Sequence, residues 1–134
     1  MTLVPTLAYE NAPAAIDWLE RAFGFRRQMV VPGEAGTIVH SELLVGPDMI
    51  MVFTRRDNVF NVQSPRTVGA RTGGVYVVLP GEVDAHCARA RAAGATIVRE
   101  PTDEEYGGRG YSCFDLEGQL WSFGTYQPTV ESPA

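Results

Sequence analysis

Cysteine is scarce in this sequence: of its 134 residues only Cys87 and Cys113 are cysteines. Two cysteines are too few for a disulfide scaffold or a zinc cluster, so we expect both to be reduced thiols in the core or near the surface. Long apolar runs are also missing, and no stretch approaches the roughly 18 residues that span a membrane. Residues 1–13 lack the basic segment and apolar run of a signal peptide. We therefore expect a cytoplasmic protein with no membrane partner.

Positive charge is the second shortage. Lysine and arginine together number 11 against 16 acidic residues, which gives a formal net charge of −5 and a pI of about 4.9. Phosphate binding needs clustered basic residues, so this balance argues against a nucleic-acid partner. The weak long-range field of the chain favours cationic ligands instead.

Common catalytic motifs are absent as well. The sequence contains no G-x-S-x-G, no P-loop and no dinucleotide-binding fingerprint. Cys113 has no nearby His or Lys in the sequence to activate its thiol, which argues against thiol catalysis. What the composition does supply is a hydrophobic fraction of 45%, enough for the core of one domain.

The first half of the chain predicts a strand, a helix and three further strands. Residues 3–9 are rich in β-favouring types, and apolar residues then recur at helical spacing over residues 14–25. Asn11 is placed to cap this helix and Gly24 to end it. The further strands are expected at residues 25–31, 37–45 and 49–54, with a turn at 46–48.

The second half repeats this order. It predicts a strand at residues 73–79, a helix within 83–95 that ends at Gly94, and strands at 96–98, 110–115 and 119–126. Three matched pairs support a duplication: Gly24 and Gly94 are 70 residues apart, and the pairs Ser41–Ser112 and Thr54–Thr125 are each 71 apart. We therefore predict an α+β fold of two tandem β-α-β-β-β modules.

The domain organisation follows from this repeat. Residues 1–126 form a single domain, with module one at 1–54, a polar linker at 55–72 and module two at 73–126. The linker is the segment expected to be most mobile. A loop is expected over residues 100–111, and residues 127–134 are expected to be a flexible tail.

The ending YGGRGYSCFDLEGQLWSFGTY, residues 106–126, resembles the glyoxalase-like branch of the vicinal oxygen chelate superfamily, which includes glyoxalases, bleomycin resistance proteins and dioxygenases. The opening PTLAYENAPAAIDWLERAFGF and the middle segment HSELLVGPDMIMVF resemble the same branch in order and spacing. The resemblance implies that the strands of both modules curl into a half-barrel, with the helices outside. It does not imply one activity, because the superfamily carries several.

In the metal enzymes of this family, a divalent ion on the cavity floor is held by His, Gln or Glu from four strand positions. The resemblance places these positions at Val4 or Pro5, at Met51, at Gly74 or Val75, and at Ser122. Val, Pro and Gly offer no side-chain donor, Met sulfur is too soft for a hard cation, and Ser alone is a poor ligand. We therefore expect no metal and no other cofactor.

Several residues are candidates for ligand contact. His40 and Glu42 lie two apart on a strand and share one face, which is either the cavity side or an exposed side of the sheet. Met49, Met51 and Phe53 alternate along the last strand of module one, where they either line a cavity or fill a closed core. Trp121 is expected in the core, and His86 is expected on the surface of its helix.

Further candidates come from loops and from the last strand. Tyr106 and Tyr111 flank a glycine loop and are placed to stack on a planar ligand, unless Tyr106 only caps the rim. Phe60 in the linker is placed to act as a lid, and Ser122 to fix the orientation of the ligand. The acidic residues 103–105 are a solvated loop or an attraction for a cationic compound.

Together these features predict a protein that binds and sequesters a hydrophobic, aromatic small molecule without a metal, in the manner of bleomycin resistance proteins. The resemblance also predicts a homodimer. The alternative is a glyoxalase-like, metal-dependent lyase, isomerase or dioxygenase that would recruit His40, Glu42 and Asp115 in a shifted site. A third possibility is a structural or interaction protein with a filled cavity.

Overall fold

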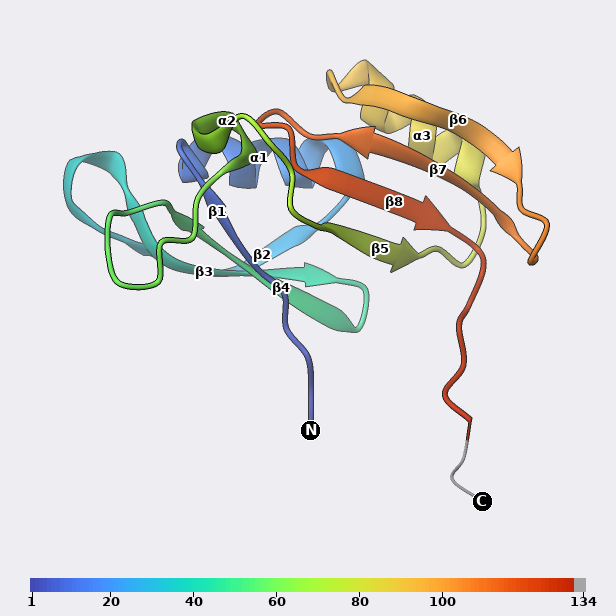
Figure 1. Ribbon diagram of the computed structural model, residues 1–134, viewed down its shortest axis with the longest axis horizontal. Coiled ribbons are helices and arrows are strands. Elements are labelled where there is room, and N and C mark those ends of the chain that lie inside the picture. Colours follow the sequence, from blue (N-terminus) through green and yellow to red (C-terminus); the bar gives the residue numbers. More distant parts are fainter. Residues whose placement is uncertain (132–134) are drawn as a thin grey trace.

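The computed structural model describes residues 1–131, which form the element order expected from the sequence (Figure 1). Module one contains β1 (Thr6–Tyr9), α1 (Ala12–Phe23), β2 (Arg26–Pro32), the 3₁₀ helix η1 (Glu34–Gly36), β3 (Ile38–Val45) and β4 (Asp48–Thr54). Module two contains β5 (Gly74–Val78), α3 (Val83–Ala92), β6 (Thr96–Asp103), β7 (Arg109–Phe114) and β8 (Leu120–Gly124). A short helix, α2 (Pro65–Val68), lies in the linker between them.

The strands form two four-stranded mixed sheets with the same topology. Their orders are β1-β4-β3-β2 and β5-β8-β7-β6, and in each sheet the first strand of the module is parallel to the last. The other neighbours are antiparallel. The predicted α+β fold of two tandem β-α-β-β-β modules is therefore confirmed.

Local signals in the sequence explain where α1 begins and ends. The side-chain oxygen of Asn11 accepts a hydrogen bond from the backbone N–H of Ala14, and Pro13 occupies the first turn, where no intrahelical donor is needed. Gly24 has a φ of 77°, in the left-handed region that glycine adopts without strain, and its N–H bonds to the Glu20 carbonyl. The predicted cap and stop of this helix are confirmed.

Module two and the linker depart from the expected boundaries. The helix of module two ends at Ala92, two residues before Gly94. Strand β6 runs on to Asp103, so the expected loop of residues 100–111 shrinks to residues 104–108. The linker contains α2, which Ser64 caps. Residues 127–131 carry no regular structure, and the rest of the predicted tail, 132–134, lies outside the described residues.

The duplication is visible in equivalent hydrogen bonds. The Thr54 hydroxyl accepts from the N–H of Ile38 at 2.8 Å, and the Thr125 hydroxyl accepts from the N–H of Arg109 at 2.9 Å. The proposed match of Ser41 with Ser112 is wrong, however. Ser41 is buried and donates to the Val52 carbonyl, whereas Ser112 pairs with Ser122 on the opposite, open face of its sheet.

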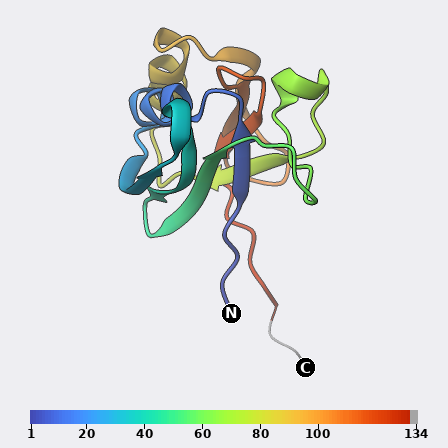
Figure 2. The same ribbon diagram turned by 90° about the vertical axis from the view of Figure 1, so that its left-hand side faces the viewer.

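The two modules pack through their helices, which lie next to each other on one side of the molecule (Figure 2). Trp18 of α1 donates its indole N–H to the carbonyl of Ala93 at the end of α3, at 2.7 Å. In return, Arg89 of α3 donates to the carbonyls of Arg21 and Glu20 at the end of α1. Each helix thus caps the carboxyl end of the other.

The core lies between these helices and the inner faces of the sheets. Phe23 of α1 packs on Trp121 and Phe123 of β8, with ring centroids 5.4 and 4.7 Å apart. Trp121 is fully buried, which confirms its predicted place. Its indole N–H and the Tyr9 hydroxyl both donate to Asp115, so buried polar atoms at the centre of the molecule are satisfied.

Candidate functional site

Each sheet buries one face against the helices and leaves the other face open. On β4, Ile50 and Val52 are buried in the core. The alternating residues Met49, Met51 and Phe53 are half-buried and lie on the open face. Both sets point as the strand alternation predicted, so module one presents an apolar wall on the outside of its sheet.

His40 and Glu42 lie on this same open face. Glu42 is the register partner of Met51 on the neighbouring strand, which settles the side that parity left undecided. The His40 Nε2 lies 2.8 Å from one Glu42 oxygen, and the Gln28 amide donates to the other at 3.0 Å. These two contacts, His40 first, lower the pKa of the Glu42 carboxyl below its ordinary value. The Glu42 carboxylate is therefore held in place next to Met51 on the open face.

Phe60 borders a small pocket at the end of this wall. The pocket has a volume of about 250 Å³ and is lined by Thr6, Phe53, Arg56, Asn58, Phe60 and Val62. The two ends of the loop that carries Phe60 are joined by a hydrogen bond, which Arg55 donates to the Gln63 amide oxygen at 2.5 Å. At its tip the Asn58 side chain accepts from the N–H groups of Phe60 and Asn61. The loop thus holds Phe60 next to Phe53, although the ring is still 79% exposed.

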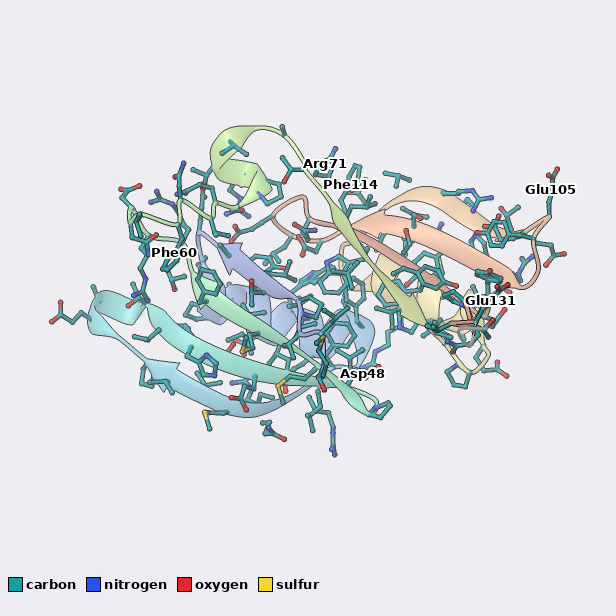
Figure 3. All side chains as sticks on the ribbon, turned by 60° about the horizontal axis from the view of Figure 1, so that its bottom comes forward. Asp48, Phe60, Arg71, Glu105, Phe114 and Glu131 are labelled. Atoms are coloured by element: carbon teal, nitrogen blue, oxygen red, sulfur yellow. The ribbon has the colours of Figure 1, made fainter. Side chains whose placement is uncertain are left out.

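Ser122 and Tyr106 belong to a different place, on module two. Ser122 lies on the open face of β8 opposite Ser112, and both residues line a pocket of about 180 Å³ together with Tyr106. This second pocket is at the far end of the molecule from Phe60. Figure 3 shows Phe60 at one end and Glu105, next to Tyr106 in the chain, at the other. The predicted contact residues therefore form two separate groups within one chain.

Tyr111 and His86 lie elsewhere than predicted. Tyr111 is only 1% exposed and its ring stacks on Phe123 in the core, so the ring does not face a ligand on the open face, although the residue is among those that line the pocket of about 180 Å³. His86 is not a surface residue: it is half-buried, 4.4 Å from the Phe123 ring, and its Nδ1 lies 2.6 Å from the Tyr111 hydroxyl. Burial lowers the pKa of His86, and Arg89 acts in the same direction.

The strand register shows which residues lie beside two of the expected ligand positions on the open faces. Thr6 is the register partner of Met51, and Tyr76 is the register partner of Ser122. The four positions thus offer hydroxyls, a thioether and a phenol that donates to the Tyr126 carbonyl. This set has no carboxylate and no imidazole, so it does not fit a hard divalent cation.

The shifted metal site of the alternative prediction does not form. Asp115 is buried among Tyr9, Trp121 and the N–H groups of Glu117 and Gln119, all of which donate to it. It therefore does not join His40 and Glu42. Within residues 1–131, no group of three or more His, Cys, Asp or Glu side chains is arranged to hold a metal ion.

No helix in the described part of the chain combines the length and the apolar character needed to cross a bilayer. The two cysteines, Cys87 and Cys113, are both free and buried. Burial raises the pKa of Cys113 to about 12, which keeps the thiol protonated and unreactive at neutral pH.

Paired β-α-β-β-β modules with helices on one face and open sheets on the other define a structural class whose members carry several different functions. The sequence matches the model of one family of this class over residues 3–123. The chain belongs to the Glyoxalase/Bleomycin resistance protein/Dioxygenase superfamily.

Its relatives are informative about fold. An uncharacterized protein of Mycobacterium bovis is 31% identical, over 96% of this chain and 84% of its own length. The crystal structure of TioX from Micromonospora sp. ML1 is similar at 37% identity, covers 92% of this chain and 97% of its own, and superposes with a TM-score of 0.71. A fosfomycin resistance protein, FosX from Listeria monocytogenes, solved with Mn(II) and sulfate, shares the fold at 15% identity, with coverage of 95% and 93% and a TM-score of 0.66.

Sequence reasoning missed several residues of both groups. Gln28 on β2 completes the His40–Glu42 cluster, and Tyr76 and Ser112 line the pocket of module two. The alternation of side chains along a strand predicts which face each of these three residues shares with its own strand. It does not predict their neighbours on adjacent strands, because those neighbours depend on the register between the strands.

Proposed function

We propose that the protein binds and sequesters a hydrophobic aromatic small molecule on the open face of module one, without a metal. The observation that carries this proposal is the apolar wall of Met49, Met51 and Phe53, which is only half-buried although its residues are large and apolar. Thioether and aromatic side chains adapt to flat apolar ligands. Phe60 extends the wall at its edge.

The His40–Glu42–Gln28 cluster supplies the polar part of this site. Glu42 is held ionised by two partners and lies opposite Met51, so it can accept a hydrogen bond from an N–H or O–H group of the ligand. This arrangement favours ligands that are flat, apolar and carry a donor or a positive charge at one edge. The net charge of −5 acts in the same sense.

A homodimer is part of the proposal. The open faces carry Met29, Val31, Tyr76 and Val78, which are 37–46% exposed. The pocket beside Phe60 is smaller than the several hundred Å³ that drug-sized ligands usually occupy, so a second copy would complete the enclosure. Sedimentation velocity at micromolar concentration tests this; a monomer at all concentrations would contradict it.

The first experiment is a thermal-shift screen of chelator-treated protein against a panel of aromatic antibiotics and against Mn, Ni, Fe and Zn. A ligand present at 100 times its Kd should stabilise the fold by about 2.7 kcal/mol. For any ligand found, Met51→Ala and Phe60→Ala should each weaken binding by about tenfold, because each removes apolar contact area.

Val59→Ala is the matched control for Phe60→Ala. Val59 is the neighbouring loop residue, is 92% exposed and does not line the pocket, so its truncation should leave the affinity unchanged. Equal weakening by both variants would mean that the loop, and not the Phe60 ring, matters. If no aromatic compound stabilises the protein but a divalent ion does, and His40→Ala abolishes that response, the alternative of a metal-dependent lyase, isomerase or dioxygenase replaces the proposal.

A further inference from the structure

The pocket on module two differs in chemistry from the apolar wall of module one. Its lining includes Tyr76, Arg99, Glu104, Tyr106, Ser112 and Ser122. These residues come from β5, β6, β7, β8 and the β6–β7 loop, and none of them belongs to module one. Module two therefore has a polar pocket on the face that corresponds to the methionine-rich wall of module one.

Two glycines create this hollow. In module one, Glu42 and Met51 are register partners, and the next residues on the same face are His40 and Phe53. In module two, Ser112 and Ser122 are partners, and Gly110 and Gly124 follow on the same face. The positions of His40 and Phe53 in module one thus correspond to glycines, which have no side chain, in module two.

Neighbouring atoms leave little room for a side chain at either glycine. A Cβ atom at Gly124 would lie 2.9 Å from the Tyr76 hydroxyl, and one at Gly110 would lie 3.0 Å from the Phe123 carbonyl oxygen. Side chains at either position would therefore clash with the pocket wall or with the backbone. The absence of side chains here is built into the packing of the sheet.

Two hydroxyls stand in the floor next to the glycines. The Ser112 and Ser122 Oγ atoms are 2.8 Å apart, so one donates to the other. Neither has a further hydrogen-bond partner within residues 1–131, which leaves one O–H donor and several lone pairs for a ligand. A donor and acceptors side by side match a ligand group that is itself both, such as neighbouring hydroxyls.

The charged groups around the pocket are already paired. Arg99 binds Glu104 through two nitrogens, and the Arg109 guanidinium binds Asp84 through two nitrogens, each at 3.0 Å, and Asp103 at 3.2 Å. Because each arginine is paired with at least one carboxylate, the pocket offers no unpaired positive charge to an anion. The paired ions still present polar edges to a neutral ligand.

Aromatic rings form the remaining wall. The Tyr106 ring meets the Tyr126 ring edge to face at 4.8 Å, and the Tyr76 hydroxyl donates to the Tyr126 carbonyl at 2.7 Å. This contact ties the segment after β8 to the pocket. The rings offer apolar faces on which the C–H face of a saturated ring can pack.

We propose that the module-two pocket binds an uncharged ring that carries neighbouring hydroxyl groups, such as a sugar residue. The serine hydroxyl pair hydrogen-bonds to the hydroxyls of the ring, the tyrosines cover its C–H face, and the ion-paired arginines leave no free positive charge for an anionic ligand. A volume of about 180 Å³ limits the occupant to one ring. The inference uses no residue of the module-one wall, so it does not depend on the proposed aromatic ligand.

Saturation-transfer NMR tests the pocket directly. The full-length protein is screened against methyl glycosides of common hexoses, with inorganic phosphate as the anionic probe. We expect saturation transfer to the ring protons of at least one glycoside, and no displacement of it by phosphate. Ser112→Ala should weaken the glycoside by about fivefold or more, because it removes a hydroxyl partner while keeping the shape of the floor.

Thr96→Ala is the matched control. Thr96 is an exposed hydroxyl residue on the same sheet that does not line the pocket, so this variant should bind the glycoside as the wild type does. Tyr106→Ala supplies a second variant at an exposed site that leaves the sheet intact. No transfer to any glycoside, phosphate binding in its place, or transfer that survives both Ser112→Ala and Tyr106→Ala overturns the inference. Loss of aromatic-ligand binding in Met51→Ala bears only on the module-one site.

Discussion

At the scale of single residues, His86 shows how a partner distant in sequence changes the role of a side chain. Its helix, α3, has a polar sequence, and a histidine in such a helix is usually exposed. In the fold, however, Phe23 of α1 and Phe123 of β8 flank its ring. Neither neighbour could be inferred from the residues around His86, because the Phe123 contact depends on how α3 packs on its own sheet and the Phe23 contact on how the two modules pack.

This burial has a measurable consequence for stability. Since the pKa of His86 is lowered in the folded protein, the unfolded chain binds a proton more readily near and below the ordinary value of 6.5. The free energy of unfolding should therefore fall as the pH is lowered from about 6.5 towards the lowered pKa, and the contribution of His86 should level off below that pKa. Urea denaturation across this range should show a steeper fall for the wild type than for His86→Gln. Equal slopes would mean that His86 does not titrate differently in the two states.

At the scale of elements, α1 is held at its amino end by a residue of the other module. Glu117, in the turn between β7 and β8, is almost fully buried and accepts hydrogen bonds from the N–H groups of Glu10 and Asn11, at 2.7 and 2.9 Å. The Ser64 hydroxyl donates to it as well, at 2.5 Å. A carboxylate at this position also opposes the positive end of the helix dipole.

Glu117→Ala should therefore destabilise the protein by about 3 kcal/mol, because it leaves one buried and two partly buried donors without their acceptor. Chemical denaturation followed by circular dichroism measures the change. Glu105→Ala is the control: its side chain points outward from the β6–β7 loop (Figure 3), and its loss should change stability by less than about 0.5 kcal/mol. A small effect of Glu117→Ala would mean that water replaces the carboxylate.

Some of the elements follow from local sequence patterns, and others depend on contacts between distant parts of the chain. The order of strands and helices, the caps of α1 and the two sides of β4 follow from local periodicity and from turn residues, and all were predictable. The extension of β6 into EPTD was not, because its pairing with β7 stabilises a segment whose Pro101 and Asp103 disfavour strands. The division of the candidate contact residues into two groups also escaped prediction, since it depends on the register and on the packing of one module against the other.

At the scale of the whole molecule, the two modules have the same topology but different surfaces. Module one offers methionines, a phenylalanine and a carboxylate, and module two offers glycines, serines and tyrosines. The open faces do not take part in core packing, so their residues can differ between the modules, whereas the equivalent hydrogen bonds of Thr54 and Thr125 are the same in both. The superfamily's range of functions on one fold has the same physical basis.

The reciprocal capping of the helices by Trp18 and Arg89 means that the covalent link between the modules is not what holds them together. Two separately produced polypeptides, cut near Val59 in the exposed linker loop, should therefore find each other and restore the native structure by fragment complementation. Mixing the fragments should recover the circular dichroism spectrum of the intact chain, and Arg89→Ala in the second fragment should lower their affinity by about tenfold. Fragments that stay apart would show that the helix contacts need the intact linker to form.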